Sequence, residues 1–163
     1  MVSVKSPTEL AGAFRAKGLK VTPQRQLLFT LLDGNASHPT AEALYTRASQ
    51  LMPGISLRTV YTTLTDLADM GELQLVALGS GAVRFDPNVD DHHHGVCDAC
   101  GSVLDLYVDG ADQLVPTGVD GFTTSSTSIV FHGTCAPCAG AASINLPAAT
   151  PDPYTNIKET THG

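Results

Sequence analysis

The sequence predicts an α+β protein of two domains, in which helices dominate the first half and short strands the second. Residues 1–70 hold four amphipathic segments with helix start and stop signals, whereas the segments that follow alternate apolar and polar residues as strands do. Charge divides the chain near the same point, because residues 1–85 have a net charge of +2 and residues 86–163 have −9. We therefore expect a mildly basic domain followed by an acidic one.

Four helices are predicted in the first domain from their start and stop residues. Thr22, Thr40 and Ser56 can cap helices, because their hydroxyls accept hydrogen bonds from free backbone amides. Glycine or proline follows each apolar segment and ends the helix. The expected helices run from just after Pro7-Thr8 to Gly18, from Pro23 to Leu32, from Ala41 to about Leu51 and from Leu57 to about Met70.

A hairpin is predicted after the last helix, because ELQLVALGSGAVRFD holds two strand-like stretches around Gly79-Ser80-Gly81. Helices followed by a hairpin make a winged helix-turn-helix domain, here residues 1–85, whose last helix enters a DNA major groove. Basic side chains would contact phosphates, and outward side chains of the last helix would read base edges. The alternative for Arg58 and Tyr61 is an ordinary solvated face. The candidate DNA contacts are Lys17, Lys20, Arg25, Arg58, Tyr61, Thr62 and Thr65.

The four cysteines of the chain form two matched pairs, Cys97-x-x-Cys100 and Cys135-x-x-Cys138. A two-residue gap lets both sulfurs of a pair reach one ion, and four thiolates make the tetrahedron that Zn²⁺ prefers. Two disulfides or four unrelated buried thiols are the alternatives. Disulfides belong to oxidising compartments, and the opening residues MVSVKSPTEL lack the apolar stretch of a signal peptide. The spacing therefore predicts a structural zinc site.

A run of three histidines, His92 to His94, precedes the first cysteine pair. In an extended segment His92 and His94 point to one side and His93 to the other, which suggests a second metal site. Mixed imidazole and carboxylate ligands suit Fe(II), Mn(II), Zn(II) or Ni(II). A solvated loop is the alternative for the run, and ordinary turn or helix-entry roles for the other candidates. The candidate ligands come from both halves of the chain: His38, Asp86, His92, His94 and Asp105.

The second domain, residues 86–140, holds two further predicted strands, VLDLYV and TSSTSIVF, separated by a short segment containing residues 111–115. With so little chain around them they cannot complete a core alone, so we expect a two-fold homodimer that presents two winged helices to palindromic DNA. Residues 141–163 lack periodicity and predict a flexible tail. No apolar run approaches the length of a membrane span, so we expect a cytoplasmic protein without a membrane partner.

These features together resemble the ferric uptake regulator family of bacterial metal-dependent repressors. The resemblance covers about residues 8–140, and implies a dimer of winged helices, a four-cysteine zinc and a separate sensing site. It rests on six motifs: GLKVTPQR at 18–25, HPTA at 38–41, SLRTVYTTL at 56–64, RFD at 84–86, HHHGVCDACG at 92–101 and FHGTCAPC at 131–138.

The resemblance also implies a function for the second site. Three histidines with two aspartates resemble the peroxide-sensing branch of the family, whereas iron-sensing relatives more often carry Glu at the position of Asp105. The implied cofactors are structural Zn²⁺ and a regulatory Fe²⁺ or Mn²⁺. With Fe(II), peroxide would oxidise His38 or His92, the metal would leave, and the DNA would be released. The alternative within the family is an iron- or zinc-responsive uptake regulator that does not sense peroxide.

Three features depart from the family pattern. Thr62 stands where the family usually has Arg in the recognition helix, so operator affinity or sequence is expected to differ. Pro116 interrupts a helix that is usually longer. A further metal site of some members would use the positions of Asp91, His93, Asp112 and Thr127, and two of its usual histidines are replaced here.

Two other classes of protein are alternatives to a DNA-binding regulator, namely a metalloenzyme and a zinc-stabilised adaptor. A metalloenzyme would need an open coordination position and a substrate cleft, and no candidate general base stands out beyond the ligands themselves. A zinc-stabilised adaptor would bind protein and not DNA. We therefore expect a regulator and not an enzyme, and we expect His132, beside the second cysteine pair, to be structural.

Overall fold

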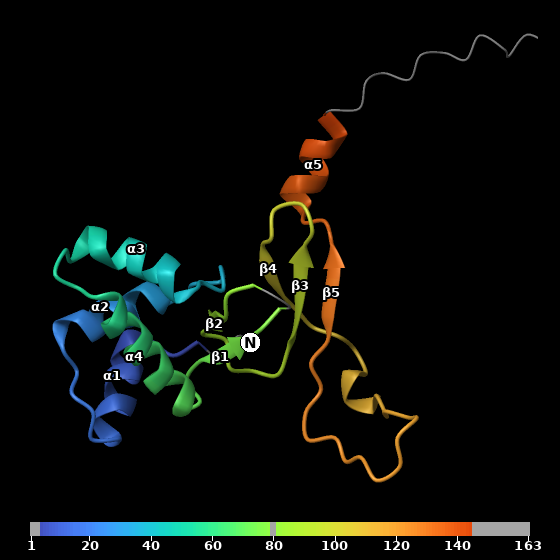
Figure 1. Cartoon of the computed structure of the whole chain (residues 1–163), viewed down its shortest axis with the longest axis horizontal. Coiled ribbons are helices and arrows are strands. Elements are labelled where there is room, and N and C mark those ends of the chain that lie inside the picture. The colour runs from blue at the N-terminus through green and yellow to red at the C-terminus, as the bar shows by residue number, and fades with distance from the viewer. Residues whose placement is uncertain (1–3, 79–80, 145–163) are drawn as a thin grey trace, which may run out of the picture.

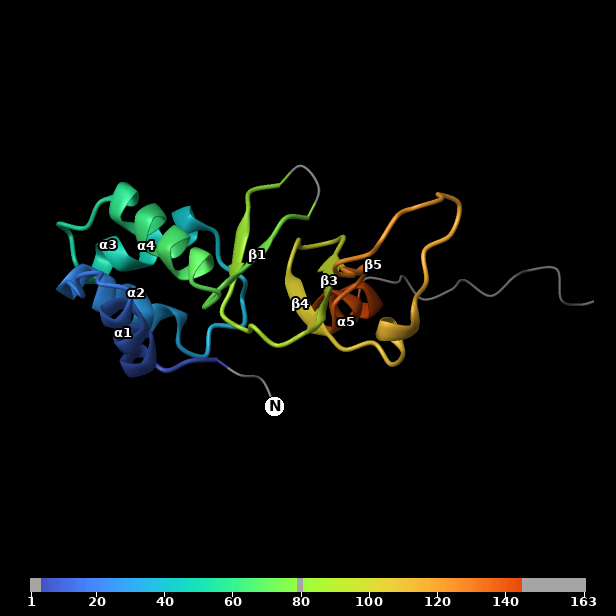
Figure 2. The ribbon, with the colours of Figure 1, turned by 90° about the horizontal axis from the view of Figure 1, so that it is seen from below.

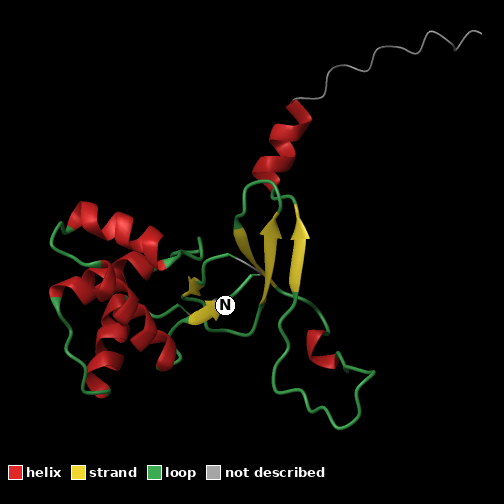
Figure 3. Cartoon of the chain, in the orientation of Figure 1, coloured by secondary structure: helices red, strands yellow, loops and turns green. Residues whose placement is uncertain are grey.

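The computed structural model describes residues 4–78 and 81–144. A helical domain lies at one end, a three-stranded sheet at the other, and a two-stranded sheet between them (Figures 1 and 2). Figure 3 shows this α+β arrangement by element type, as the sequence predicted. The elements, in chain order, are α1 (Pro7–Ala16), α2 (Pro23–Leu32), α3 (Ala41–Leu51), α4 (Leu57–Asp69), β1 (Gln74–Val76), β2 (Arg84–Asp86), β3 (His93–Cys97), β4 (Val103–Leu106), η1 (Ala111–Gln113), β5 (Val130–Gly133) and α5 (Ala136–Ile144).

Each of the first four helices begins at a residue whose hydroxyl caps it. The predicted caps Thr22, Thr40 and Ser56 accept from the backbone amide three residues later, at 3.3, 3.2 and 3.1 Å. Helix α1 begins at Pro7, slightly earlier than the sequence predicted, because Ser6 and Glu9 form a reciprocal capping box. Among the described residues, no helix is long and apolar enough to cross a membrane.

One hydrophobic core holds the helical domain together. Phe14 of α1 packs edge-on against Phe29 of α2, with ring centroids 5.0 Å apart, and both rings are fully buried. Helix α4 turns Val60, Leu64 and Leu67 into the same core. This inward stripe leaves the opposite face of α4 in solvent, as the sequence predicted for a reading helix.

The two-stranded sheet connects the helical domain to the chain that follows. Strands β1 and β2 pair antiparallel, with Gln74 opposite Asp86, which confirms the predicted hairpin; residues 79–80 of its turn lie outside the described residues. Strand β2 also contacts the loop before α3, because the Phe85 amide donates to the Pro39 carbonyl at 2.9 Å and Thr40 forms a β-bridge with Arg84. The end of β2 is thereby fixed against the start of α3.

The three-stranded sheet has the order β4-β3-β5, with β3 antiparallel to β4 and parallel to β5. Strand β5 begins at Val130, so residues 124–129 of the predicted strand TSSTSIVF are not strand. The ladder with β3 starts where Val130 meets His94, and the chain before it does not pair with β3 as a strand. Between β4 and β5 the chain forms a single 3₁₀ turn, η1, in place of a longer helix.

Helix α5 runs to Ile144, past residue 140, where the sequence had placed the start of the flexible tail. The first four residues of the predicted tail are therefore helical. Small residues dominate this segment, and alanine in particular favours helix. Residues 145–163 of the predicted tail lie outside the described residues.

Candidate metal centres

The four cysteines lie together at the end of the three-stranded sheet. Each Sγ atom lies within 4.8 Å of the other three, and Cys100 Sγ is 3.7 Å from Cys135 Sγ. A disulfide needs about 2.05 Å between sulfurs, so this spacing excludes the alternative of disulfide pairing. Four sulfurs about 2.3 Å from one zinc ion lie about 3.8 Å apart, which is close to the distance found.

Backbone geometry presents these sulfurs. Cys97 ends β3, and the Gly101 amide donates to the Cys97 carbonyl at 2.8 Å, which closes the turn that carries Cys100. The Cys135 amide donates to Cys97 Sγ at 3.3 Å, so the second pair is joined to the first. Because β3 and β5 are neighbours, the sheet itself brings the two pairs together.

The thiols differ in acidity in a way that favours a cation among them. Hydrogen bonds from the backbone amides of Cys135 and Cys100 lower the pKa of Cys97 to about 6. Hydrogen bonds with Cys135 and Cys100 raise the pKa of Cys138 to about 12. Four thiolates cannot coexist so closely without a positive charge, and a soft divalent ion such as Zn²⁺ supplies it.

A second cluster lies where the two domains meet. The five predicted ligands come from the loop before α3, from β2, from β3 and the residue just before it, and from β4. Each places one donor atom within 4.8 Å of all the others. His94 on β3 lies directly opposite Asp105 on β4, so the register of the sheet sets part of the cluster. The five residues that the structure brings together are His38, Asp86, His92, His94 and Asp105.

One oxygen of each carboxylate faces the imidazole nitrogens. Asp86 Oδ2 lies 2.8 Å from His92 Nε2, 3.2 Å from His94 Nε2 and 3.3 Å from His38 Nε2. Asp105 Oδ1 lies 2.6 Å from His38 Nε2 and 3.5 Å from His92 Nε2. Ligands about 2.0–2.2 Å from one ion lie about 3 Å from one another when they subtend a right angle, so these separations fit a shared ion.

Buried polar atoms without hydrogen-bond partners also indicate a shared ion. Both ring nitrogens of His38 and Asp105 Oδ1 are buried and make no hydrogen bond within the described residues. His38 Nε2 and Asp105 Oδ1 are in close contact without hydrogen-bond geometry, as two ligands of one ion would be. The residues present therefore fit a divalent cation with nitrogen and oxygen ligands.

Burial and charge shift the pKa values within the cluster. Burial lowers the pKa of His38, but the facing carboxylates of Asp86 and Asp105 outweigh it and leave that pKa above 6.5. Burial raises the pKa of Asp86, but the nearby His38 imidazole and the hydrogen bond from the Asn88 amide reverse this and bring it to about 2. Burial also lowers the pKa of His94. Without a cation, a proton on His38 partly neutralises the two aspartates.

A backbone carbonyl outside the cluster fixes the orientation of the His92 ring. The Asp90 carbonyl lies 2.8 Å from His92 Nδ1 and can only accept, so Nδ1 carries the proton and leaves the lone pair of Nε2 facing inward. His93 faces the other way, as the alternation predicted, and its Nδ1 accepts from the Ile129 amide at 3.4 Å. The buried ring of His93 borders a hollow lined also by Asp91 and Asp112.

The family profile described as ferric uptake regulator family matches residues 16–132, which include both clusters except the second cysteine pair. The chain belongs to the ferric uptake regulator family. A relative named peroxide-responsive repressor PerR, from Staphylococcus epidermidis, is 32% identical over 133 residues, covering 80% of this chain and 88% of that protein. A relative named peroxide operon regulator, from Bacillus subtilis, is 29% identical over 133 residues, covering 80% and 92%.

Solved structures of this family share the fold. The Vibrio cholerae ferric uptake regulator is 27% identical and superimposes with a TM-score of 0.58, covering 77% of this chain and 98% of that one. The Helicobacter pylori ferric uptake regulator superimposes with a TM-score of 0.67 at 16% identity, covering 85% and 97%. The winged-helix and sheet domains predicted from sequence are therefore those of the ferric uptake regulator fold.

The predicted DNA contacts fall into two groups. Lys17, Lys20, Arg58, Tyr61, Thr62 and Thr65 are exposed. Arg25 is instead occupied within the domain: it donates to Asp66 at 2.9 Å and to the Lys20 carbonyl at 2.8 Å, and its guanidinium lies 5.0 Å from the Phe14 ring centroid. Its contacts hold α1, α2 and α4 together, so a role in DNA binding would require it to exchange partners.

Sequence reasoning missed three residues that support the second cluster or the reading helix. Arg84 donates to the His38 carbonyl at 3.1 Å and to the Gly101 carbonyl at 3.4 Å, so it joins the two clusters. Glu42 accepts a hydrogen bond from the Tyr61 hydroxyl. Asn88 contacts both carboxylates of the cluster. Asn88 could have been noticed as an amide two residues after a carboxylate, a spacing typical of Asx turns.

Proposed function

We propose that this chain is a metal-dependent repressor of transcription that senses peroxide through its histidine–aspartate cluster. The observation that carries the proposal is the composition of that cluster, three imidazoles and two aspartates within 4.8 Å of one another. The relatives named as peroxide-responsive repressors support it. The regulatory ion would be Fe²⁺ or Mn²⁺, and the four cysteines would hold structural Zn²⁺.

The cluster can act as a switch because it spans two domains. His38 comes from the loop before α3 in the helical domain, whereas His92, His94 and Asp105 belong to the sheet domain. Shared coordination would fix the angle between the domains, and with it the position of α4. Loss of one ligand would release that constraint and shift the population away from the DNA-binding arrangement.

Peroxide sensing would work by changing one of the ligands. Bound ferrous iron supplies the redox chemistry that activates peroxide, which Mn(II) does not supply. Overall, one peroxide oxygen adds to an imidazole carbon of His38 or His92, and the other leaves as water. The oxidised ring is a poorer donor, so the cluster loses affinity for its ion and the helical domain is freed.

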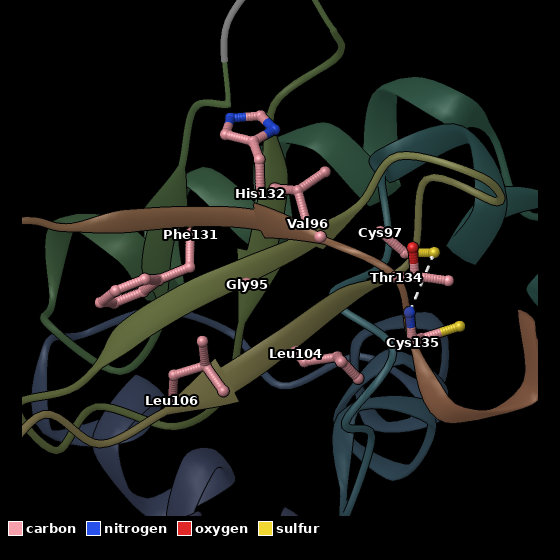
Figure 4. A pocket seen from close by; sticks show the side chains of 10 residues that line it. Gly95, Val96, Cys97, Leu104, Leu106, Phe131, His132, Thr134 and Cys135 are labelled. Carbon is pink, nitrogen blue, oxygen red and sulfur yellow. Dashed lines mark hydrogen bonds between the residues drawn. The ribbon is translucent and has the colours of Figure 1, made fainter. Parts of the chain in front are cut away.

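Operator binding would use two copies of the chain. In the sheet domain, the face opposite the histidine–aspartate cluster carries Leu104 and Phe131 on either side of Gly95 (Figure 4), and these side chains are 45% and 43% exposed. In the segment before β5, Val115 and Phe122 are 81% and 67% exposed. Apolar surface of this kind suits contact with a second copy, and a two-fold dimer would match a palindromic operator in the cytoplasm.

Direct contacts with DNA would come from the exposed residues of the helical domain. Lys17, Lys20 and Arg58 would contact phosphates, and Arg25 would join them if it left Asp66. Tyr61, Thr62 and Thr65 lie on the solvent face of α4 and would face the bases. The proposal is a binding protein and not an enzyme, in keeping with the regulators named among its relatives.

The decisive experiment compares two metals. Zinc-loaded protein is charged anaerobically with Fe(II) or Mn(II), treated with peroxide, and assayed for operator binding and intact mass. We expect the Fe(II) form to lose binding and gain one oxygen atom, while the Mn(II) form keeps both its binding and its mass. If neither form responds, the chain is an uptake regulator that does not sense peroxide, and if both lose binding the ligand-oxidation account is wrong.

A further inference from the structure

Asn88 is a buried residue of the loop between β2 and β3, with 2% of its surface exposed. All its polar side-chain atoms have partners. Its Oδ1 accepts from the Asp90 amide at 3.2 Å, and its Nδ2 donates to Asp105 Oδ2 at 2.8 Å and to the Tyr107 hydroxyl at 3.2 Å. The Asp90 amide donates on one side and the Asp105 carboxylate accepts on the other, which fixes the way the side-chain amide of Asn88 points.

The same residue reaches the second carboxylate through its backbone. The Asn88 amide donates to Asp86 Oδ1 at 2.8 Å. Asn88 therefore occupies one oxygen of each aspartate, namely Asp86 Oδ1 and Asp105 Oδ2. The oxygens it leaves free, Asp86 Oδ2 and Asp105 Oδ1, are the two that face the histidines.

We propose that Asn88 is a positioning residue that makes each aspartate of the cluster a single-oxygen donor. It holds the outer oxygen of Asp86 and of Asp105, so only the inner oxygens turn toward the ion. The inference rests on the proposed metal-binding function, and it deepens that function by assigning the denticity of the carboxylates to a residue outside the ligand set.

By this arrangement Asn88 limits the number of donor atoms that the cluster offers to an ion. With single-oxygen carboxylates the cluster offers five donor atoms, three nitrogens and two oxygens. Divalent ions that favour octahedral surroundings accept six. A carboxylate free to rotate could supply its second oxygen and fill the remaining position, whereas Asn88 keeps that position available to a small molecule such as peroxide.

The first test is the affinity of zinc-loaded protein for Mn(II), measured by titration. Asn88→Asp is the sharpest variant, because it keeps the backbone donor to Asp86 and an acceptor for Asp90 but replaces the donor to Asp105 with an oxygen. Asn88→Ala removes the side chain altogether. We expect both to bind Mn(II) about 10- to 100-fold more weakly, as removal of an outer partner of a ligand does.

A matched control is Asn35→Ala. Asn35 also closes a turn close to a ligand, since it donates to the Leu31 carbonyl and accepts from the amide of Ser37 just before His38, but it touches no carboxylate. We expect this variant to bind Mn(II) as the unsubstituted protein does. Equal losses in Asn35→Ala and Asn88→Ala would overturn the proposal, because any disturbed turn near the cluster would then have the same effect.

The second readout is the Mn(II) electron paramagnetic resonance spectrum, which reports the symmetry of the ligands and not the stability of the fold. A freed Asp105 is expected to change that spectrum in both Asn88 variants, while zinc content stays the same. An unchanged spectrum, whether affinity falls or not, means that Asn88 does not set carboxylate denticity. If the unsubstituted protein does not bind Mn(II) at all, the proposed function itself fails, which is a distinct result.

Discussion

In the proposed switch the critical residue is His38, because among the five candidate ligands it comes from the loop before α3 of the helical domain. It is 1% exposed, and it is the only non-glycine residue in the described chain with a positive φ, at 48°. Few side chains tolerate that backbone conformation, and histidine is among those enriched there. Strain at this position is consistent with a residue placed for binding rather than for packing.

Proton uptake by His38 is expected to make metal binding dependent on pH. The pKa of His38 lies above its usual value of 6.5 because the facing carboxylates outweigh burial. Coordination needs the neutral ring, so the proton competes with the ion as pH falls through this raised pKa. We expect the Mn(II) affinity of zinc-loaded protein to decline from pH 8 to pH 6, measured by titration; His38→Gln, which cannot take up that proton, should show a shallower decline. An affinity that stays flat over this range would contradict the assignment.

Helix α4 carries one of the residues at which the chain departs from the family pattern. Thr62 is exposed on the outward face of α4, where the resemblance leads us to expect arginine. Thr62→Arg adds a cation that can contact a phosphate or a guanine edge. We expect tighter operator binding and a dependence of affinity on salt that steepens by about one unit of slope.

The control for this substitution is Thr46→Arg, which adds the same charge at an exposed position of α3. Binding measured across several salt concentrations should separate the two variants. If both steepen the slope equally, α4 is not specifically the element that lies against the DNA.

Strand β2 connects the two clusters through Arg84. Because its guanidinium donates to the carbonyls of His38 and Gly101, we expect Arg84→Met to loosen the backbone of His38 and lower Mn(II) affinity about tenfold. Zinc content, measured by elemental analysis, should not change. Arg47→Met, at an exposed position of α3, is the control. Loss of zinc from the Arg84 variant would show that Arg84 supports the cysteine cluster instead.

The elements that could be predicted from sequence are those set by local signals. Caps at Thr22, Thr40 and Ser56 predicted three helices whose starts match the structure. The alternation of His92 to His94 predicted correctly that His93 faces away. These inferences succeeded because capping and strand alternation act over a few residues.

Long-range features could not be predicted in the same way. The start of β5 at Val130 depends on its pairing with β3, and no residue within TSSTSIVF encodes it. The Arg25 contact with Asp66 joins positions 41 residues apart, and Asn88 reaches Asp105 across 17 residues. Such contacts depend on packing between elements, which a single sequence does not reveal.

At the scale of the whole molecule, the proposed function gives the two clusters separate tasks. The cysteine cluster joins the ends of β3 and β5 and would stabilise the sheet domain, whereas the histidine–aspartate cluster joins the sheet domain to the helical domain. Only the second cluster can report a change of ligand as a change of domain angle. A reversible sensor and a permanent scaffold therefore need different ligands.

Removing one sulfur tests the scaffold. Cys138→Ser leaves three thiolates, and we expect it to lose zinc and to unfold at a markedly lower temperature, because structural zinc contributes directly to folding free energy. Ser102→Ala, which removes the hydroxyl 2.9 Å from Cys100 Sγ without touching the ligand set, should keep its zinc. Elemental analysis and thermal unfolding measure both effects. A zinc-free Cys138 variant with unchanged thermal stability would show that the site is not a scaffold.

In the proposed function one ion, shared by ligands from both domains, determines whether the helical domain can hold DNA. This is tested most directly by measuring operator affinity as a function of Mn(II) concentration, for zinc-loaded protein and for His38→Ala. The variant keeps the other four candidate ligands of the cluster. We expect the operator affinity of the unsubstituted protein to rise steeply with Mn(II) concentration. The operator affinity of His38→Ala should respond little, even where Mn(II) is bound. Full activation of His38→Ala by Mn(II), or no response to Mn(II) in either protein, would contradict the proposed function.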